Sequence, residues 1–286
     1  MVNTEKVKMS PLYLTLIREL HQDKVEINDR KIARHGPIDI DDHGFIDFPD
    51  FSFEPDLCGD GLVHGCTVIG KNFRRFLQEM PRYVNRSSAL ACCWVGTLDR
   101  FLPLGLAEEE RPAYLADTIR KYRITQAGFG GMNHLCPDME IGLRLGWTGL
   151  LEKIRYCRKR NRPADPDFYE GEEQLVLGIL EWVKAHQRLA QQRAEKETDP
   201  FRKENYEAIA AVNGALCCRA PGSFREAVQF LAHFQSVDRT YCGGGALGAL
   251  DTLLEEYFER DIESGILTEE EAVWMIASLF LSLIHI

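Results

Sequence analysis

The sequence predicts a predominantly helical fold, and three observations support this prediction. After residue 62, apolar residues recur three and four positions apart over long stretches, which is the spacing of helices with one buried face. Signals that start and stop helices flank several of these stretches. In contrast, residues 36–62 are rich in Asp, Gly and Pro, and predict an extended loop or short strands.

The first half of the chain predicts two helices separated by this loop. Residues 1–30 mix acidic and basic residues in every turn and predict a helix followed by a turn. Residues 70–80 (GKNFRRFLQEM) have the apolar spacing of a second helix. The acidic surroundings of His43 could bind a cation, but a solvated loop is the simpler interpretation.

The second half of the chain predicts a series of amphipathic helices. Residues 172–197 carry one broad apolar stripe, and Asp199 followed by Pro200 is a typical cap and first residue for the next helix. Ser223 precedes another helical pattern. We expect five aromatic residues at helical spacing to lie in the core: Trp182, Phe224, Phe230, Phe234 and Trp274.

The last two predicted helices have clear boundaries. Gly265 is a stop signal for the first of them. Thr268 and Glu271 have the spacing of a capping box at the start of the second. This last helix runs into apolar residues 283–286 without a cap, so we expect the sequence to be part of a longer protein.

The composition excludes several classes of protein. The 286 residues carry a formal net charge of −10, with 45% hydrophobic and 27% charged residues, which suits a globular protein of one large or two small domains. The acidic balance argues against a nucleic-acid or anionic membrane partner, because both need clustered Lys and Arg. The sequence has neither a secretory signal nor an apolar run of membrane-spanning length, so we expect a cytoplasmic protein.

The nine cysteines predict reduced thiols. Their number is odd and no secretory signal accompanies them, so a disulfide framework is not expected. We expect the adjacent pairs at 92–93 and 217–218 to pack as buried free thiols. No C-x-x-C spacing occurs, and His64 with Cys66 is too sparse for zinc, so no metal site is predicted.

One segment, residues 128–150 (GFGGMNHLCPDMEIGLRLGWTGL), places His134 and Asp138 before an apolar helical run. Pro137 suits the first helical turn, and the helix dipole favours Asp138 and Glu140 in that turn. A histidine beside an aspartate can also move a proton near neutral pH. The structural alternative is that Asp138 is only an acidic residue of the first turn and that His134 caps or packs the helix. A dinucleotide site is not predicted, because G-x-G-x-x-G spacing and a preceding strand are absent.

Three segments carry motifs of one known family, in the family's order. His134 to Asp138, followed by GLRLGWTGL at 142–150, is similar to Gly-His-x-x-Pro-Asp and a glycine-containing helix. Residues 194–230 include Thr-Asp-Pro and Glu-Ala-x-Gln, and residues 250–272 include Asp-Ile-Glu-x-Gly and Leu-Thr-x-Glu-Glu-Ala. Together these segments resemble the N-terminal part of the pyruvate formate-lyase family of glycyl radical enzymes.

This resemblance implies a fold class and a domain organisation. The class is α/β, predominantly helical in this part, with the chain forming the N-terminal part of a ten-stranded α/β barrel. Residues 1–286 would be an incomplete pyruvate formate-lyase-like domain. Residues 1–120 form a divergent N-terminal region, and residues 121–286 form a family-like region of helices and a first strand. The C-terminal glycyl radical domain would be absent.

The resemblance also implies radical chemistry for the full-length protein, as a lyase, a dehydratase or a formate acetyltransferase-like enzyme. A glycine stores the radical, and a loop cysteine takes a hydrogen atom from a small polar substrate as a thiyl radical. Both residues are expected beyond residue 286, so we expect no bound cofactor and no activity of the chain alone. The implied partners are a radical S-adenosylmethionine activating enzyme, a small-molecule substrate and a second copy of the chain.

The substrate-binding residues implied by the family are His134, Asp138 and Gly244. Gly244 belongs to a glycine cluster, residues 243–245, that stands where the family has a polar stretch. Glycines there allow a ligand to approach the backbone, but a tight packing bend is the structural alternative. A different class also stays open for the whole chain, namely a non-catalytic helical scaffold or degenerate homologue.

Overall fold

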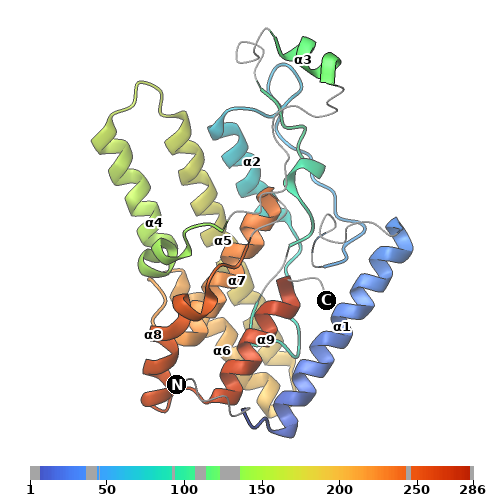
Figure 1. Ribbon diagram of the computed structural model, residues 1–286, viewed down its shortest axis with the longest axis vertical. Coiled ribbons are helices and arrows are strands. Elements are labelled where there is room, and N and C mark those ends of the chain that lie inside the picture. The colour runs from blue at the N-terminus through green and yellow to red at the C-terminus, as the bar shows by residue number, and fades with distance from the viewer. Residues whose placement is uncertain are drawn as a thin grey trace.

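The computed structural model describes residues 7–36, 44, 46–91, 94–106, 114–122, 136–242 and 246–283. Within these ranges the chain folds into helices (Figure 1). In chain order these are α1 (Pro11–His35), α2 (Cys66–Glu79), the 3-10 helix η2 (Leu98–Arg100), α3 (Leu115–Tyr122), α4 (Met139–Asn161), α5 (Asp167–Lys196), α6 (Pro200–Leu216), α7 (Phe224–Cys242), α8 (Leu250–Glu263) and α9 (Glu269–Leu283).

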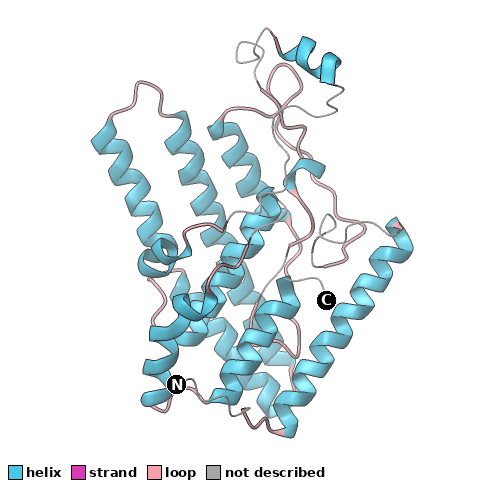
Figure 2. Ribbon diagram, viewed as in Figure 1, coloured by secondary structure: helices cyan, strands magenta, loops and turns pink. Residues whose placement is uncertain are grey.

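The prediction of a predominantly helical chain is confirmed for the described residues. Figure 2 shows helices and loops there and no strand. The nearest approach to a sheet is one isolated parallel bridge between Val63 and Leu104. The barrel strands implied by the resemblance are not found in the described ranges, so the barrel stays an expectation.

The helix boundaries that the sequence predicts are largely confirmed. The Asp199 carboxylate accepts a hydrogen bond from the amide of Arg202 at 2.9 Å, and Pro200 begins α6. At the start of α9, the Glu271 carboxylate accepts from the amide of Thr268 at 2.8 Å, and the amide of Glu271 donates to the Thr268 hydroxyl at 3.3 Å. These contacts satisfy amides that the first turn of a helix leaves without partners.

Glycines bring α2 and α5 into close contact. A Cβ atom added to Gly70 would lie 2.4 Å from the carbonyl oxygen of Gly171, and one added to Gly171 would lie 2.3 Å from that of Cys66. Two turns further along α5, an added Cβ on Gly178 would lie 2.8 Å from the Cα of Arg74. Because these contacts advance in the same direction on both helices, α2 and α5 are parallel and their N-termini are neighbours.

Asp167, the first residue of α5, caps the N-terminus of α2. Its carboxylate oxygens accept hydrogen bonds from the amides of Cys66 at 2.6 Å and Thr67 at 2.9 Å. Burial opposes ionisation of this carboxyl, but the hydrogen bonds from Thr67 and Cys66 outweigh burial and lower the pKa of Asp167. One negative charge therefore offsets the positive ends of two parallel helix dipoles.

A buried non-helical segment, residues 87–91, crosses the interior between the helices. The side-chain amide of Gln229 on α7 accepts from the amide of Ala91 at 2.8 Å and donates to its carbonyl at 2.6 Å. The amide of Ala89 donates to the hydroxyl of Ser278 on α9 at 3.0 Å. Arg225 on α7 donates to the Ala89 carbonyl at 2.9 Å. Side chains thus replace the backbone partners that a sheet would provide.

The same segment is fixed at its start by α6 and α9. Asn205 donates to the Ser88 carbonyl at 2.8 Å, and the indole N–H of Trp274 donates to the Ser87 carbonyl at 2.9 Å. Arg225 is half-buried, and burial lowers the pKa of its guanidinium to about 10. The group still keeps its charge at neutral pH, so its hydrogen bonds are charge-assisted.

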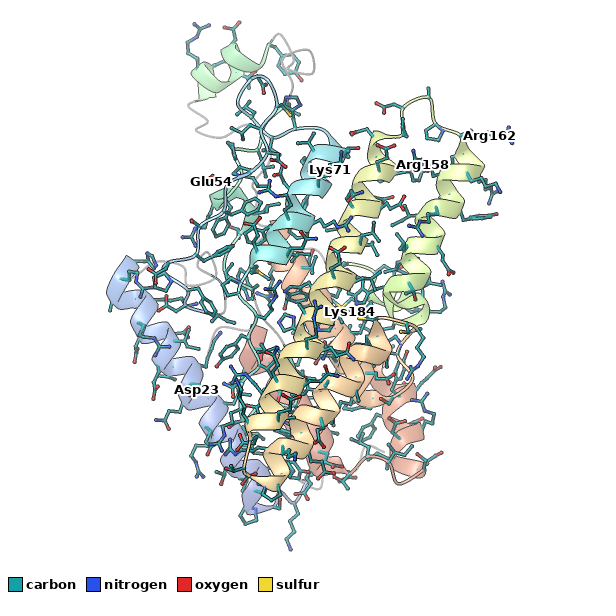
Figure 3. All side chains as sticks on the ribbon, turned by 180° about the vertical axis from the view of Figure 1, so that it is seen from behind. Asp23, Glu54, Lys71, Arg158, Arg162 and Lys184 are labelled. Carbon is teal, nitrogen blue, oxygen red and sulfur yellow. The ribbon has the colours of Figure 1, made fainter. Side chains whose placement is uncertain are left out.

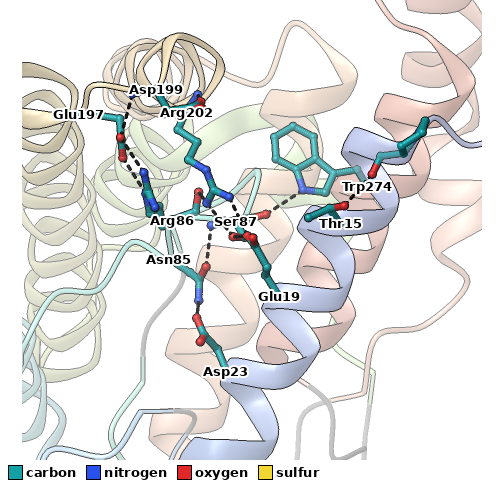
Figure 4. Close-up of polar contacts among 11 residues, drawn as sticks. Thr15, Glu19, Asp23, Asn85, Arg86, Ser87, Glu197, Asp199, Arg202 and Trp274 are labelled. Atoms are coloured by element: carbon teal, nitrogen blue, oxygen red, sulfur yellow. Dashed lines mark hydrogen bonds and ion pairs between the residues drawn. The ribbon is translucent and has the colours of Figure 1, made fainter.

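Ion pairs connect α1 and the α5–α6 junction to the entry of this segment (Figure 4). The Glu19 carboxylate of α1 accepts from the Ser87 hydroxyl at 2.5 Å and from Arg202 at 2.8 Å. Arg86 donates to both carboxylate oxygens of Glu197, at 2.8 Å each. The loop entering the core is therefore held on two sides.

The predicted aromatic core is confirmed, with one residue at its edge. Trp182, Phe230 and Trp274 are at most 2% exposed, and Phe224 is 3% exposed, whereas Phe234 is half-buried. By contrast, Figure 3 shows the side chains of exposed charged residues standing on the outer side of the helices. Apolar residues therefore lie on the buried faces of the helices and charged residues on the exposed faces, as the helical spacing of the sequence predicted.

We expect the substitution Gly171→Ala to destabilise the protein by about 1–3 kcal/mol, because the new methyl group would overlap the backbone of α2. Urea unfolding followed by circular dichroism measures this change. Gly59→Ala is the matched control, since an added Cβ there meets no atom within 4 Å. Equal stability of the two variants would contradict close packing of α2 on α5.

We expect Gln229→Leu to cost about 2–4 kcal/mol of unfolding free energy, because both backbone groups of Ala91 would stay buried without partners. Gln191→Leu makes the same chemical change on an exposed face of α5 and should have little effect. Both values come from denaturant unfolding. A Gln229→Leu protein as stable as the control would refute the role of this amide.

Candidate functional site

The structure describes one of the three predicted site residues. His134 and Gly244 lie outside the described residues. Asp138 is the N-cap of α4, and its exposed carboxylate accepts a hydrogen bond from the amide of Ile141 at 3.2 Å. The prediction that Pro137 and Asp138 lie inside the first turn is wrong, because the helix begins at Met139. Aspartate is favoured at the cap itself, where its side chain replaces a missing backbone acceptor.

The start of α4 meets the segment that follows α7. A Cβ atom added to Gly248 would lie 2.5 Å from the thiol sulfur of Cys136, and Gly248 has a left-handed φ of 66°. Gln235 on α7 donates a hydrogen bond to the carbonyl of Ala246 at 3.0 Å and lies 4.0 Å from the sulfur of Met139. Residues flanking both predicted motifs, 134–138 and 243–245, are therefore neighbours. We call this contact the α4–α7 junction.

Two glycines of the motif allow α4 to pack closely on α7 and on the residues just before it. An added Cβ on Gly142 would lie 2.8 Å from the ring of Phe230 on α7. At Gly146 the backbone has φ 64° and ψ 177°, which kinks the helix, and an added Cβ would lie 2.8 Å from the backbone of Ala220. Trp147 then stacks on Phe230 with ring centroids 4.6 Å apart. The glycines let α4 pack directly on α7 and hold its first turn at the junction.

The α4–α7 junction presents polar groups of the protein to solvent. The amides at the start of α4 and the positive end of its dipole favour an acceptor, and the Asp138 carboxylate already accepts from the Ile141 amide. The exposed Asp138 carboxylate can accept a hydrogen bond from a hydroxyl group. The thiol of Cys136 is also exposed and lies 3.5 Å from the carbonyl oxygen of Pro137. Sequence reasoning missed Cys136, Gln235 and Gly248.

Two buried histidines are structural. Burial lowers the pKa of His186 to about 4 and that of His233 well below the usual value, so both are neutral at pH 7. Nδ1 of His186 donates to the carbonyl of Trp182 at 3.0 Å, and Nε2 of His233 accepts from the amide group of Gln229 at 3.0 Å. We assign these tautomers from the hydrogen-bond partners. Neither ring reaches solvent, so neither can exchange protons with a substrate.

The cysteine pair at 217–218 differs in part from its predicted packing. Cys217 is half-buried, and burial raises the pKa of its thiol to about 11, which makes it unreactive. Cys218 is exposed, contrary to prediction, because α6 ends at Leu216 and the chain turns away from the core. The pair at 92–93 lies outside the described residues.

The described residues offer neither a cluster of metal ligands nor a membrane-spanning helix. Among the described side chains, no group of three or more His, Cys, Asp or Glu could hold a metal ion. None of the helices in the described ranges combines the length and the apolar character that a membrane span needs.

Comparison with known proteins defines the class of this chain. Residues 107–286 match the family described as pyruvate formate lyase-like. The match covers the α4–α7 junction and all helices from α4 to α9. The chain belongs to the pyruvate formate lyase-like family, as the three motifs predicted.

Two curated relatives are a glycyl radical subunit of a decarboxylase and a sulfite-lyase. The chain is 30% identical over 162 residues to the 4-hydroxyphenylacetate decarboxylase glycyl radical subunit of Clostridium scatologenes, covering 56% of this chain and 17% of the relative. It is also 30% identical over 156 residues to the isethionate sulfite-lyase of Nitratidesulfovibrio vulgaris, covering 51% and 19% respectively. The chain therefore spans about a fifth of the length of these relatives.

Solved structures show that the fold likeness extends over the N-terminal region as well. A structure described under 1,2-propanediol dehydration in Roseburia inulinivorans has a TM-score of 0.66 at 18% identity, covering 98% of this chain and 40% of that chain. The B12-independent glycerol dehydratase of Clostridium butyricum has a TM-score of 0.63 at 13% identity, covering 99% and 40%. At these identities the likeness shows the fold alone.

We expect Gln235→Leu to loosen both sides of the α4–α7 junction together. The loss of the hydrogen bond to Ala246 should cost about 1–3 kcal/mol. Hydrogen exchange should become faster in residues 136–141 and in residues 246–250, measured by mass spectrometry of peptides. Gln191→Leu serves as the control that leaves both segments unchanged. Faster exchange in only one segment would show that Gln235 does not couple them.

Proposed function

We propose that this chain is the helical part of a glycyl radical enzyme that acts on a small polar substrate as a lyase or a dehydratase. The observation that carries the proposal is the family match over residues 107–286. The names of the relatives support it, because they include a decarboxylase, a sulfite-lyase and a (2S)-3-sulfopropanediol dehydratase. The whole protein would surround its substrate with a ten-stranded α/β barrel.

In the proposed reaction a thiyl radical removes a hydrogen atom from a substrate carbon. The S–H bond forms as the C–H bond breaks, and the unpaired electron moves to the substrate. A neighbouring bond to oxygen, sulfur or carbon then breaks, and a proton must be supplied or removed at the leaving group. The cysteine and the radical glycine would belong to parts of the protein beyond these 286 residues.

We propose that His134, Asp138 and Gly244 contact the substrate in this reaction. Asp138 is exposed at the start of α4, so its free lone pairs can accept a hydrogen bond from a substrate hydroxyl. The contact between Cys136 and Gly248 supports a common location for the two motifs. Glycine at 244 would let the substrate approach the backbone.

The proposed enzyme would need an activating partner and would act in the cytoplasm. A radical S-adenosylmethionine enzyme would generate the glycyl radical, and the protein would work as a homodimer in the cytoplasm. No metal or organic cofactor would be bound by this chain. The alternative is a helical scaffold without radical chemistry, which makes the opposite prediction in the following experiment.

The complete open reading frame that encodes this chain should form a glycyl radical. After anaerobic activation with a radical S-adenosylmethionine enzyme, electron paramagnetic resonance should show a glycine-centred doublet. The 286-residue chain treated identically should show none. A complete protein that stays silent under conditions that activate a relative would support the scaffold instead.

In the activated protein, Asp138→Asn should lower kcat/KM by at least about tenfold, because asparagine keeps the cap but loses the carboxylate. Turnover is measured on glycerol, 1,2-propanediol, isethionate and 4-hydroxyphenylacetate, the compounds named for the relatives. Asp199→Asn changes another N-cap, at the start of α6, and should leave kcat/KM unchanged. Equal activity of both variants would exclude Asp138 from the substrate site.

A further inference from the structure

A groove lies between α4 and α5, and its described lining does not include Asp138. Its volume is about 550 Å³, which lies within the range of small-molecule sites. Phe73 from the middle of α2 and the C-terminal half of α7 line the remaining side. The walls are mostly aromatic and aliphatic, and include Trp147, Ile154, Phe168, Leu175, Phe234 and Tyr241.

One carboxylate in this groove has no partner among the residues that the structure describes. Glu172 is half-buried, and it makes no hydrogen bond or ion pair with any residue in the described part of the chain. Burial is the one cause that raises the pKa of Glu172, so Lys153, which also borders the groove, does not offset its charge. An unpaired carboxylate in apolar surroundings is costly unless a ligand supplies a partner.

Two neighbouring acidic residues of α5 form ion pairs, unlike Glu172. Glu170 pairs with Arg158 of α4 at 2.7 Å, and Glu173 pairs with Arg155 of α4 at 2.6 Å. The two basic residues thus join α4 to α5 outside the groove, while Glu172 lines its interior. Pairing of the helices therefore uses the acids on both sides of Glu172 and leaves Glu172 unused.

We propose that this groove binds an amphiphilic amine, with its apolar body between α4 and α5 and its ammonium group on the Glu172 carboxylate. The walls favour an apolar body, and the aromatic rings also attract a cation. An ammonium group gives the carboxylate a charge-assisted hydrogen bond. A carboxylic acid would be repelled by Glu172, and a neutral alcohol would leave its charge unpaired. This proposal does not depend on radical chemistry.

Isothermal titration calorimetry on the 286-residue chain tests the proposal with three matched probes. They are 4-phenylbutylamine, 4-phenyl-1-butanol and 4-phenylbutyrate, which share one apolar body. We expect the amine to bind at least about tenfold more tightly than the alcohol, and the acid to bind most weakly. Glu172→Gln should make the affinities for amine and alcohol equal.

Two further variants separate the groove from general charge effects. Glu152→Gln removes one exposed carboxylate of α4 that does not line the groove, and should preserve the preference for the amine. Cys157→Phe fills the groove with a larger side chain and should weaken all three probes, with folding verified by circular dichroism. Equal affinity for amine and alcohol on the unaltered chain, a preference that survives in Glu172→Gln, or no binding of the amine would each overturn the proposal.

Discussion

The architecture depends on one constraint: a non-helical segment of backbone crosses the interior and must have its polar groups paired. Residues 87–91 have no neighbouring strand in the described part of the chain, so side chains of three helices supply the partners. This requirement explains why α6, α7 and α9 place Asn205, Arg225, Gln229 and Ser278 on buried faces. Each of these residues would be unfavourable in an apolar core without the segment it binds. The helices and the segment therefore order one another.

Local signals of the sequence predicted the helices well. Caps such as Asp199 and Thr268 act on amides within three residues, so their effect can be read without knowledge of the fold. The apolar period likewise located the core positions of α5 and α7. What could not be predicted is any polar contact between distant residues. The Gln229 amide binds a backbone 138 residues away, and Asp167 caps a helix that starts 101 residues earlier.

For the candidate site, the sequence identified the motif around Asp138 but not the residues of other segments that contact it. The order of the motifs predicted the family, and Asp138 does stand at the start of a helix, but as its N-cap and not inside the first turn. Gln235 and Gly248 were missed because nothing in their local sequence indicates which segment they face. Gln235 is one of several polar residues on the buried side of α7, so its polarity alone did not distinguish it. The glycines at 142 and 146 were recognised as family features, and the structure adds their packing role against α7.

The buried histidines have a consequence for behaviour in acid. The pKa of each ring is lowered in the folded state, so between its folded value and the normal value of about 6.5 the unfolded chain binds more protons. Stability from this source is complete above pH 6.5 and declines as the pH falls towards the folded pKa, which is about 4 for His186. Unfolding is thereby coupled to proton uptake, and mild acidification weakens the centre of the helical core before the surface carboxylates are neutralised.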